Sequence, residues 1–92
     1  MTAVADRIRH KLTSALSPSR LVVLDESHRH AGHAGSRPEG ETHFRVEITS
    51  TAFTGLSRVA RQRLVYDVLA EELRDPVHAL SLATTTPEEA GA

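Results

Sequence analysis

The sequence of 92 residues contains no cysteine, and this absence excludes several kinds of site. Without thiols the chain forms no disulfide, supplies no catalytic thiolate and offers no Cys-type metal site of its own. Aromatic residues are also scarce, with no tryptophan, one tyrosine and two phenylalanines. The core must therefore be built mainly from aliphatic side chains, and in a chain this short we expect that core to be thin.

Long apolar runs and an excess of charge of one sign are missing as well. No apolar segment approaches the roughly 20 residues that cross a bilayer, and residues 1–11 are charged where a signal peptide would be apolar. Eleven basic and twelve acidic residues leave a formal charge of −1, which argues against coating nucleic acid by bulk charge. We expect a single domain over residues 1–92 that is cytoplasmic and has no membrane partner.

Apolar periodicity predicts the order of helices and strands. Apolar residues recur every four positions within residues 3–16, which indicates an amphipathic helix. The aliphatic run at residues 21–24 and the alternation at residues 42–49 predict two strands. Residues 57–73 predict a longer helix, buried over much of its circumference, and residues 77–84 predict a third strand. This order predicts an α+β two-layer domain in which helices cover one face of a three-stranded sheet.

The segments between these elements are rich in residues that break regular structure. Residues 27–41 contain three glycines and a proline, so we expect a flexible loop. In the connector before the long helix, Gly55 is expected to permit a turn with positive φ. Phe53 and Tyr66 are predicted to lie in the core. The acidic tail at residues 87–92 is expected to be frayed.

Histidine is the residue type that stands out, with six in the chain. Four of them fall between residues 28 and 43, and His78 opens the last predicted strand. A neutral imidazole is a common metal ligand, so these histidines are candidates for a metal site. The spacing of His28, His30 and His33 could instead hold a zinc or nickel ion adventitiously. The alternatives are polar loop histidines and, for His78, a histidine hydrogen-bonded at the edge of the core.

Three arginines, Arg58, Arg61 and Arg63, gather at the start of the long predicted helix. Cations there oppose the helix dipole, so the arrangement calls for an explanation. Either the side chains are solvated or paired, for example Arg63 with Asp67 one turn later, or they dock an acidic partner or DNA phosphate. The shortage of aromatic platforms favours a partner protein over DNA. Nothing in the sequence pairs a nucleophile with a base, so we predict a binding protein and no enzyme.

Several short blocks then carry a family resemblance. They read Asp-Glu-Ser, Glu-Thr-His-Phe-Arg-Val, Phe-Thr-Gly-Leu-Ser, Arg-Gln-Arg-Leu-Val-Tyr, Leu-Ala-Glu-Glu-Leu and Val-His-Ala-Leu, at residues 25–27, 41–46, 53–57, 61–66, 69–73 and 77–80. In this order and spacing they make the chain resemble the BolA family over nearly its whole length. The resemblance implies a class II KH-like fold with the order αββααβ, which agrees with the order predicted above.

The resemblance also implies a function for the histidines. BolA-like proteins pair with monothiol glutaredoxins and hold a [2Fe-2S] cluster for iron-sulfur trafficking or iron regulation, with glutaredoxin and glutathione supplying the sulfur ligands. The family's histidine at the start of the last strand corresponds to His78. Its second ligand, from the loop between the first two strands, corresponds to His30 or His33, and His43 is a third candidate. Two imidazoles replace two thiolates in the same way in Rieske centres.

Other BolA-like proteins are described as DNA-binding transcriptional regulators, and this is the alternative function that the resemblance implies. The basic start of the long helix, with Arg58, Arg61 and Arg63, would then contact DNA. Two departures bear on this alternative. The family usually has Arg-His-Arg where this chain has Gln62 between two arginines, and the Gly-x-x-Gly loop of nucleic-acid-binding KH domains is absent.

Overall fold

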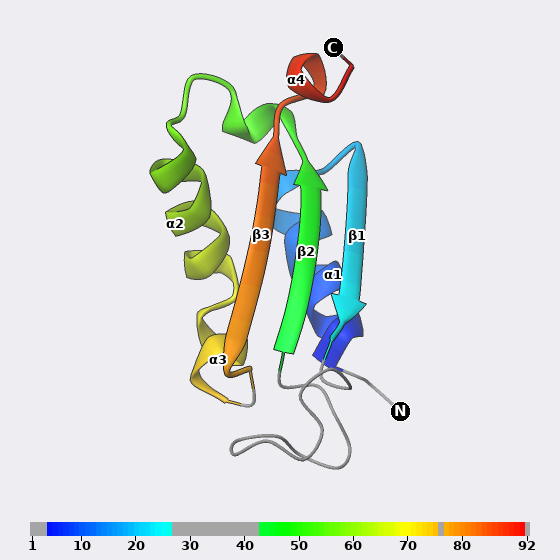
Figure 1. Ribbon diagram of the computed structural model, residues 1–92, viewed down its shortest axis with the longest axis vertical. Helices are drawn as coiled ribbons and strands as arrows, with labels where there is room; N and C mark the ends of the chain where they lie inside the picture. The colour runs from blue at the N-terminus through cyan, green and yellow to red at the C-terminus, as the bar shows by residue number, and fades with distance from the viewer. Residues whose placement is uncertain (1–3, 27–42, 76, 92) are drawn as a thin grey trace.

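The chain folds into one three-stranded sheet with helices packed around it (Figure 1). The computed structural model describes residues 4–26, 43–75 and 77–91. The elements in chain order are α1 (Val4–Leu16), β1 (Arg20–Asp25), β2 (His43–Thr49), the 3-10 helix η2 (Thr51–Phe53), α2 (Arg58–Val68), α3 (Ala70–Arg74), β3 (Ala79–Thr85) and α4 (Pro87–Gly91). The predicted order αββααβ is confirmed, with one more short helix after it. The predicted flexible loop at residues 27–41 lies outside the described residues.

The sheet places β2 in the middle, with an antiparallel neighbour on one side and a parallel neighbour on the other. A parallel pair cannot be joined by a tight turn, so the chain crosses over through α2 and α3 before it forms β3. In Figure 1, α1 lies behind the sheet and α2 runs beside β3. The opposite face of the sheet carries no helix among the described residues, as the sequence predicts.

The core lies between α1 and the sheet. The predicted stripe on the first helix is confirmed, because Val4, Ile8, Leu12 and Leu16 are all buried. On the sheet, alternate residues of β2 face the same layer, and the exposed fraction of Val46 is 0%. Phe53 is equally buried and closes the layer at the end of β2. Two predictions about the connector are therefore confirmed, since Phe53 is a core residue and Gly55 has a φ of 82°.

The prediction of one long helix over residues 57–73 is wrong in two respects. The helix breaks at Leu69, whose φ of −101° and ψ of 19° lie outside the helical region, so α2 and α3 point in different directions. Burial is also less than predicted: Val65 and Leu69 are buried as expected, but Leu64, Val68 and Leu73 are only partly buried. Val59 and Tyr66 are 62% and 40% exposed, which corrects the core assignment of Tyr66. The physical reason is that α2 lies at the side of the sheet and buries one face only.

The tail predicted to be frayed contains a helix instead. α4 begins after Thr86, whose hydroxyl accepts a hydrogen bond from the Glu89 N–H, while the Glu89 carboxylate accepts one from the Thr86 N–H. This reciprocal arrangement is a capping box, and Pro87 suits the first helical position. An ion pair between Glu89 and Arg61 ties the helix to α2. In the part of the chain that the structure describes, no helix is long and apolar enough to cross a bilayer.

Candidate functional site

The clearest chemical feature is a pair of imidazole rings at one end of the sheet. His43 opens β2, and His78 directly precedes β3. Because β2 and β3 are parallel and His43 pairs with Ala79, both histidines lie at the same end of neighbouring strands. Their ring centroids are 6.4 Å apart and their planes differ by 24°. His78 is exposed and His43 is half-buried, so the pair can be reached from solvent.

The backbone on either side of His78 is held firmly. Val77 is buried, and its N–H donates to the carbonyl of Glu72 over 2.9 Å. On the other side of His78, strand β3 begins at Ala79. His43 is likewise fixed, because its carbonyl accepts a hydrogen bond of 2.8 Å from the Glu26 N–H. Backbone hydrogen bonds on both strands therefore position the two imidazoles at this end of the sheet.

Glu72 anchors this end of the molecule. Its exposed fraction is 0%, and its carboxylate accepts hydrogen bonds from Arg7 at 2.7 Å and from Lys11 at 3.0 Å. Both cations come from α1, so the carboxylate fastens α3 to the core helix. A buried carboxylate is tolerated only when it is paired in this way. The same residue thus links α1, through its side chain, to the backbone that carries His78.

The ionisation of these groups follows from their contacts. Burial raises the pKa of Glu72, but hydrogen bonds from Lys11, from the Glu72 backbone and from Arg7 together outweigh burial and leave that pKa lowered. The hydrogen bonds from Lys11 to Glu71 and Glu72 raise the pKa of Lys11. Every partner in the cluster is therefore charged near neutral pH, and the anchor is an ionic one.

The predicted ligands divide into those the structure describes and those it does not. His78 and His43 are brought together. His30 and His33 lie outside the described residues, as does His28. Among the residues with described positions, no group of three or more histidine, cysteine, aspartate or glutamate side chains could hold a metal ion. A metal ion held by the described pair would need its remaining ligands from elsewhere.

The donor type of the two histidines matches the iron-sulfur group that the resemblance implies. Their imidazoles are nitrogen donors of the kind that replace two thiolates on one iron of a Rieske cluster. Metal–imidazole bonds are about 2.1 Å long, so two rings on one ion cannot have centres much farther apart than the observed 6.4 Å. The rings are stacked and would have to rotate edge-on before both could ligate, which the exposure of His78 permits.

The three arginines predicted to form one docking patch have separate roles. Arg61 donates to the carbonyls of Leu56 and Thr84 and forms a bidentate pair with Glu89, at 2.7 and 3.0 Å. Its side chain is only 13% exposed, and the carboxylate raises the pKa of the guanidinium. Arg61 therefore joins α2, β3 and α4. Arg58 and Arg63 are exposed and make no hydrogen bond or ion pair to any described residue, so the suggested pair of Arg63 with Asp67 does not form there.

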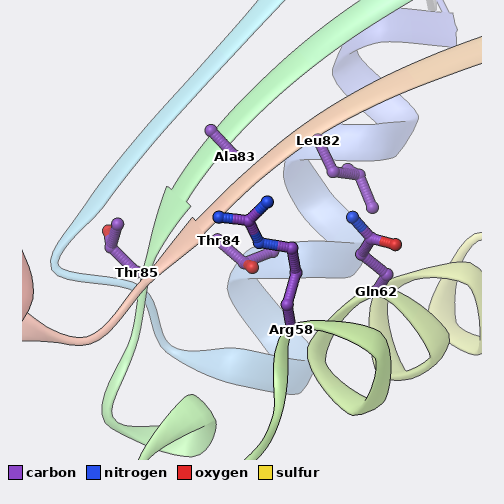
Figure 2. Close-up of a pocket in the computed structure, with 6 residues that line it drawn as sticks. All are labelled: Arg58, Gln62, Leu82, Ala83, Thr84 and Thr85. Carbon is purple, nitrogen blue, oxygen red and sulfur yellow. The ribbon is translucent and has the colours of Figure 1, made fainter.

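A groove lies between α2 and β3, and Figure 2 shows the residues that line it. Arg58 and Gln62 reach from α2 toward the strand, one helical turn apart. Leu82 and Thr84 lie opposite them on β3. The groove has a volume of about 270 Å³. A cation, an amide and a strand backbone thus meet around one open space.

Sequence reasoning missed the anchor and the groove, although signals for the anchor were present. Glu72 follows the buried Val65 and Leu69 at helical spacing, so a buried carboxylate could have been predicted there. Arg7 and Lys11 are four residues apart on one helix face, as a shared anion requires. Nothing in the sequence marks Gln62 as a groove residue, because the groove depends on how α2 sits beside β3.

The fold is an α+β domain with a three-stranded sheet, and comparisons with known proteins identify the same type of domain. A family model described as "BolA-like protein" matches residues 12–89. The chain belongs to the BolA-like family.

Individual relatives agree with this membership. "BolA1 from Arabidopsis thaliana" is a solved structure with a TM-score of 0.87 and 47% identity, covering 97% of each chain. The curated "Protein BOLA1, chloroplastic" of Arabidopsis thaliana is 51% identical over 87 residues, 92% of this chain and 54% of that protein. This chain thus spans about half the length of that relative. "DNA-binding transcriptional regulator BolA" of Escherichia coli is 46% identical over 86 residues, 94% of this chain and 78% of that protein.

Proposed function

We propose that this chain is a binding module that pairs with a monothiol glutaredoxin and shares a [2Fe-2S] cluster with it. The observation that carries the proposal is the histidine pair, in which a solvent-accessible His78 lies beside His43 at one end of the sheet. The pair offers nitrogen donors and the chain contains no cysteine. The glutaredoxin and its glutathione would therefore supply the sulfur.

In this proposal His78 and His43 hold the cluster from the BolA side, and the cluster itself is the cargo or the signal that is passed on. Neutral imidazoles give the site less negative charge than thiolates would, which raises its reduction potential relative to an all-thiolate site. Imidazole binds metal only when it is deprotonated, so retention weakens as the solution becomes more acidic. The chain's contribution is binding and positioning, with no catalysis, and we place it in the cytoplasm.

Co-expression with a monothiol glutaredoxin, followed by anaerobic purification and visible absorption spectroscopy, tests the proposal. We expect a coloured heterodimer whose cluster absorption differs from that of the glutaredoxin homodimer. The variant His78→Ala should lose that difference. The variant His10→Ala is the matched control, because His10 is an exposed histidine on α1 and should leave the spectrum unchanged.

The ligand assignment has its own test. If His43→Ala leaves the spectrum unchanged while His30→Ala or His33→Ala alters it, the second ligand is in the loop and the assignment to His43 is wrong. A colourless mixture with no heterodimer would overturn the proposed function as a whole.

A second function, DNA-binding transcriptional regulation, is favoured by one observation. Arg58 and Arg63 are exposed on α2 and have no partner among the described residues, and one relative carries that function in its name. Arg61 is unsuitable as a DNA contact because its guanidinium holds Glu89 and two carbonyls. The test is promoter binding at several salt concentrations. The double variant Arg58→Ala and Arg63→Ala should weaken binding and flatten its salt dependence, and unchanged binding would exclude this function.

A further inference from the structure

The outer edge of β3 carries backbone groups that no described neighbour uses. In a parallel pair, alternate residues direct both backbone groups toward the neighbouring strand, and the residues between them direct theirs away. The Thr85 carbonyl accepts from Ser50 and so faces the β2 side, whereas the Thr84 carbonyl accepts from the Arg61 side chain on the outer side. By this alternation the N–H and C=O groups of Leu80 and Leu82 also face outward, where they have no partner in the described structure.

An unpaired edge is usually protected by charge, a bulge or a covering segment, because it can pair with another strand. Here the stretch from Leu80 to Thr84 is regular strand. At about 3.3 Å per residue it extends roughly 13 Å, and because the Thr84 carbonyl is held by Arg61, the free part from Leu80 to Ala83 is enough for a segment of about three residues. The edge therefore has the length and the free hydrogen-bonding groups that strand addition requires.

The groove beside this edge gives the added strand a chemical preference. Alternate side chains of a strand placed against β3 would enter the groove, where they would meet Leu82, Gln62 and Arg58 (Figure 2). The Arg58 guanidinium has no carboxylate partner among the described residues. This differs from Arg20 and Arg45 on the open face of the sheet, which both pair with Glu47. The unbalanced cation favours an acidic side chain in the groove.

We propose that the edge of β3 binds an extended acidic segment of a partner protein, which adds to the sheet as a fourth strand with a carboxylate facing Arg58. Backbone hydrogen bonds to Leu80 and Leu82 supply affinity, and the groove supplies the preference for acid. This surface is independent of the function proposed for the histidines, since it uses none of their atoms.

Two other occupants fit the surface less well. A second copy of this chain would bring its own Arg58 toward the Arg58 of the first, with no acidic residue lining the groove to balance the two cations. Single-stranded nucleic acid binds through stacking on aromatic side chains, and none lines the groove. It would also leave the alternating N–H and C=O groups of the edge without matching partners.

The test uses the full chain and a capped seven-residue peptide of alternating glutamate and valine. Titration followed by ¹H–¹⁵N NMR should shift the amides of Leu80 and Leu82 and slow their hydrogen exchange. The same peptide with lysine in place of glutamate should bind at least tenfold more weakly. Two further peptides carry N-methyl groups at alternate positions, one at the odd residues and the other at the even residues. Only one edge of the added strand faces β3, so the peptide whose methyl groups lie on that edge should not bind and the other should.

Two charge-reversal variants provide a matched pair. Arg58→Glu should weaken peptide binding at least tenfold, and it should fold, since an acidic residue suits the start of a helix. Arg63→Glu changes the charge by the same amount on the same helix but outside the groove, so its effect should stay below twofold. The proposal fails if the peptide leaves Leu80 and Leu82 unshifted, if both methylated peptides bind, if an oligonucleotide binds these residues more tightly, or if the amides shift with protein concentration alone.

Discussion

The two main helices of this small domain differ sharply in how they use their apolar residues. Every residue of the predicted stripe on α1 is buried, from Val4 to Leu16. On α2 apolar residues occur around much of the helix, yet Val65 is the one buried residue and Val59 is 62% exposed. Both helices have the same sheet available. They differ because α1 lies across the helix-covered face, whereas α2 lies along the outer side of β3.

The α1 side of the molecule is therefore a structural scaffold, and the α2 side is a surface available for binding. The α1 side holds the core and the ionic anchor at Glu72, both of which fix the backbone near the histidines. The α2 side leaves Arg58, Gln62 and the outer edge of β3 accessible. Residues on the first side should therefore matter mainly for stability, and residues on the second mainly for binding. The following predictions test that division, from the largest expected effect to the smallest.

Truncation in the core should have the largest effect. Ile8→Ala removes a fully buried side chain from α1, and we expect it to lower the free energy of unfolding by about 2–5 kcal/mol. Val59→Ala removes a similar group from α2, where it is exposed, and should change stability by less than about 0.5 kcal/mol. Urea denaturation of the two variants checks the contrast. Equal losses would show that α2 is part of the scaffold after all.

Substitutions of two adjacent glutamates compare the stability contributed by a buried ion pair with that of an exposed one. Lys11 contacts both Glu71 and Glu72, but the side-chain exposures are 72% and 1%. Glu72→Gln leaves Arg7 and Lys11 without the charge they share, and should cost about 1–3 kcal/mol. Glu71→Gln removes an exposed pair and should have little effect. Thermal unfolding measures both, and NMR of the Val77 and His78 amides should show a displaced backbone in the first variant only.

Substitutions of two serines compare the stability contributed by a buried helix cap with that of an exposed one. Ser50 is buried, donates to the Leu16 carbonyl at 2.6 Å and accepts from Ala52 at 3.0 Å. Ser57 is exposed and caps α2 by accepting from Ala60 at 3.1 Å. Ser50→Ala strands a buried carbonyl and should cost about 1–3 kcal/mol, whereas Ser57→Ala should cost about 1 kcal/mol. Equilibrium unfolding would contradict the comparison if Ser57→Ala proved the costlier change.

The smallest effect is expected from acid at α4. Hydrogen bonds from Arg61 and then Thr86 lower the pKa of Glu89 from its usual 4.5 to about 2. A lowered folded-state pKa means that the contact contributes its full stability above pH 4.5 and loses it as the pH falls toward 2. We expect NMR signals of α4 to broaden across that window, while those of α1 stay sharp.

A neighbouring residue controls for general acid effects on α4. Glu88 is exposed and its carboxylate makes no hydrogen bond or ion pair to the described residues. Glu88→Gln should therefore leave the acid transition in place. Glu89→Gln should loosen α4 already at neutral pH. A transition that survives in Glu89→Gln would show that another group causes it.

The sequence was sufficient to predict the parts of the fold that depend on local periodicity. The stripe on α1, the alternation in β2 and the turn at Gly55 each follow from the spacing of residue types. The wrong burial predicted for α2 arises because the sequence does not say where an apolar helix packs. Tyr66 and Val59 were expected to be buried because the wheel of α2 is apolar, but burial also needs a facing surface. The capping box at Thr86 was a readable signal for α4 that a short acidic tail obscured.

The candidate site was predicted in part, for a similar reason. His78 and His43 were singled out by residue type and resemblance, but their proximity comes from the parallel register of β2 and β3, which a sequence does not display. The arginines were grouped by their nearness in the chain, whereas a helix sends neighbours in different directions. Arg61 therefore points to Glu89 and β3, while Arg63 lies away from the groove.

The parallel pairing of β2 and β3 has a consequence for the order of events during folding. His43 and His78 are joined by the whole crossover through α2 and α3, and parallel pairing across such a connection forms late because its loop must close first. A nascent chain that ends before β3, or one trapped without it, has at most one of the two rings in place. A ligand that requires both imidazole rings therefore binds only the fully folded chain, so binding of such a ligand would report that folding is complete.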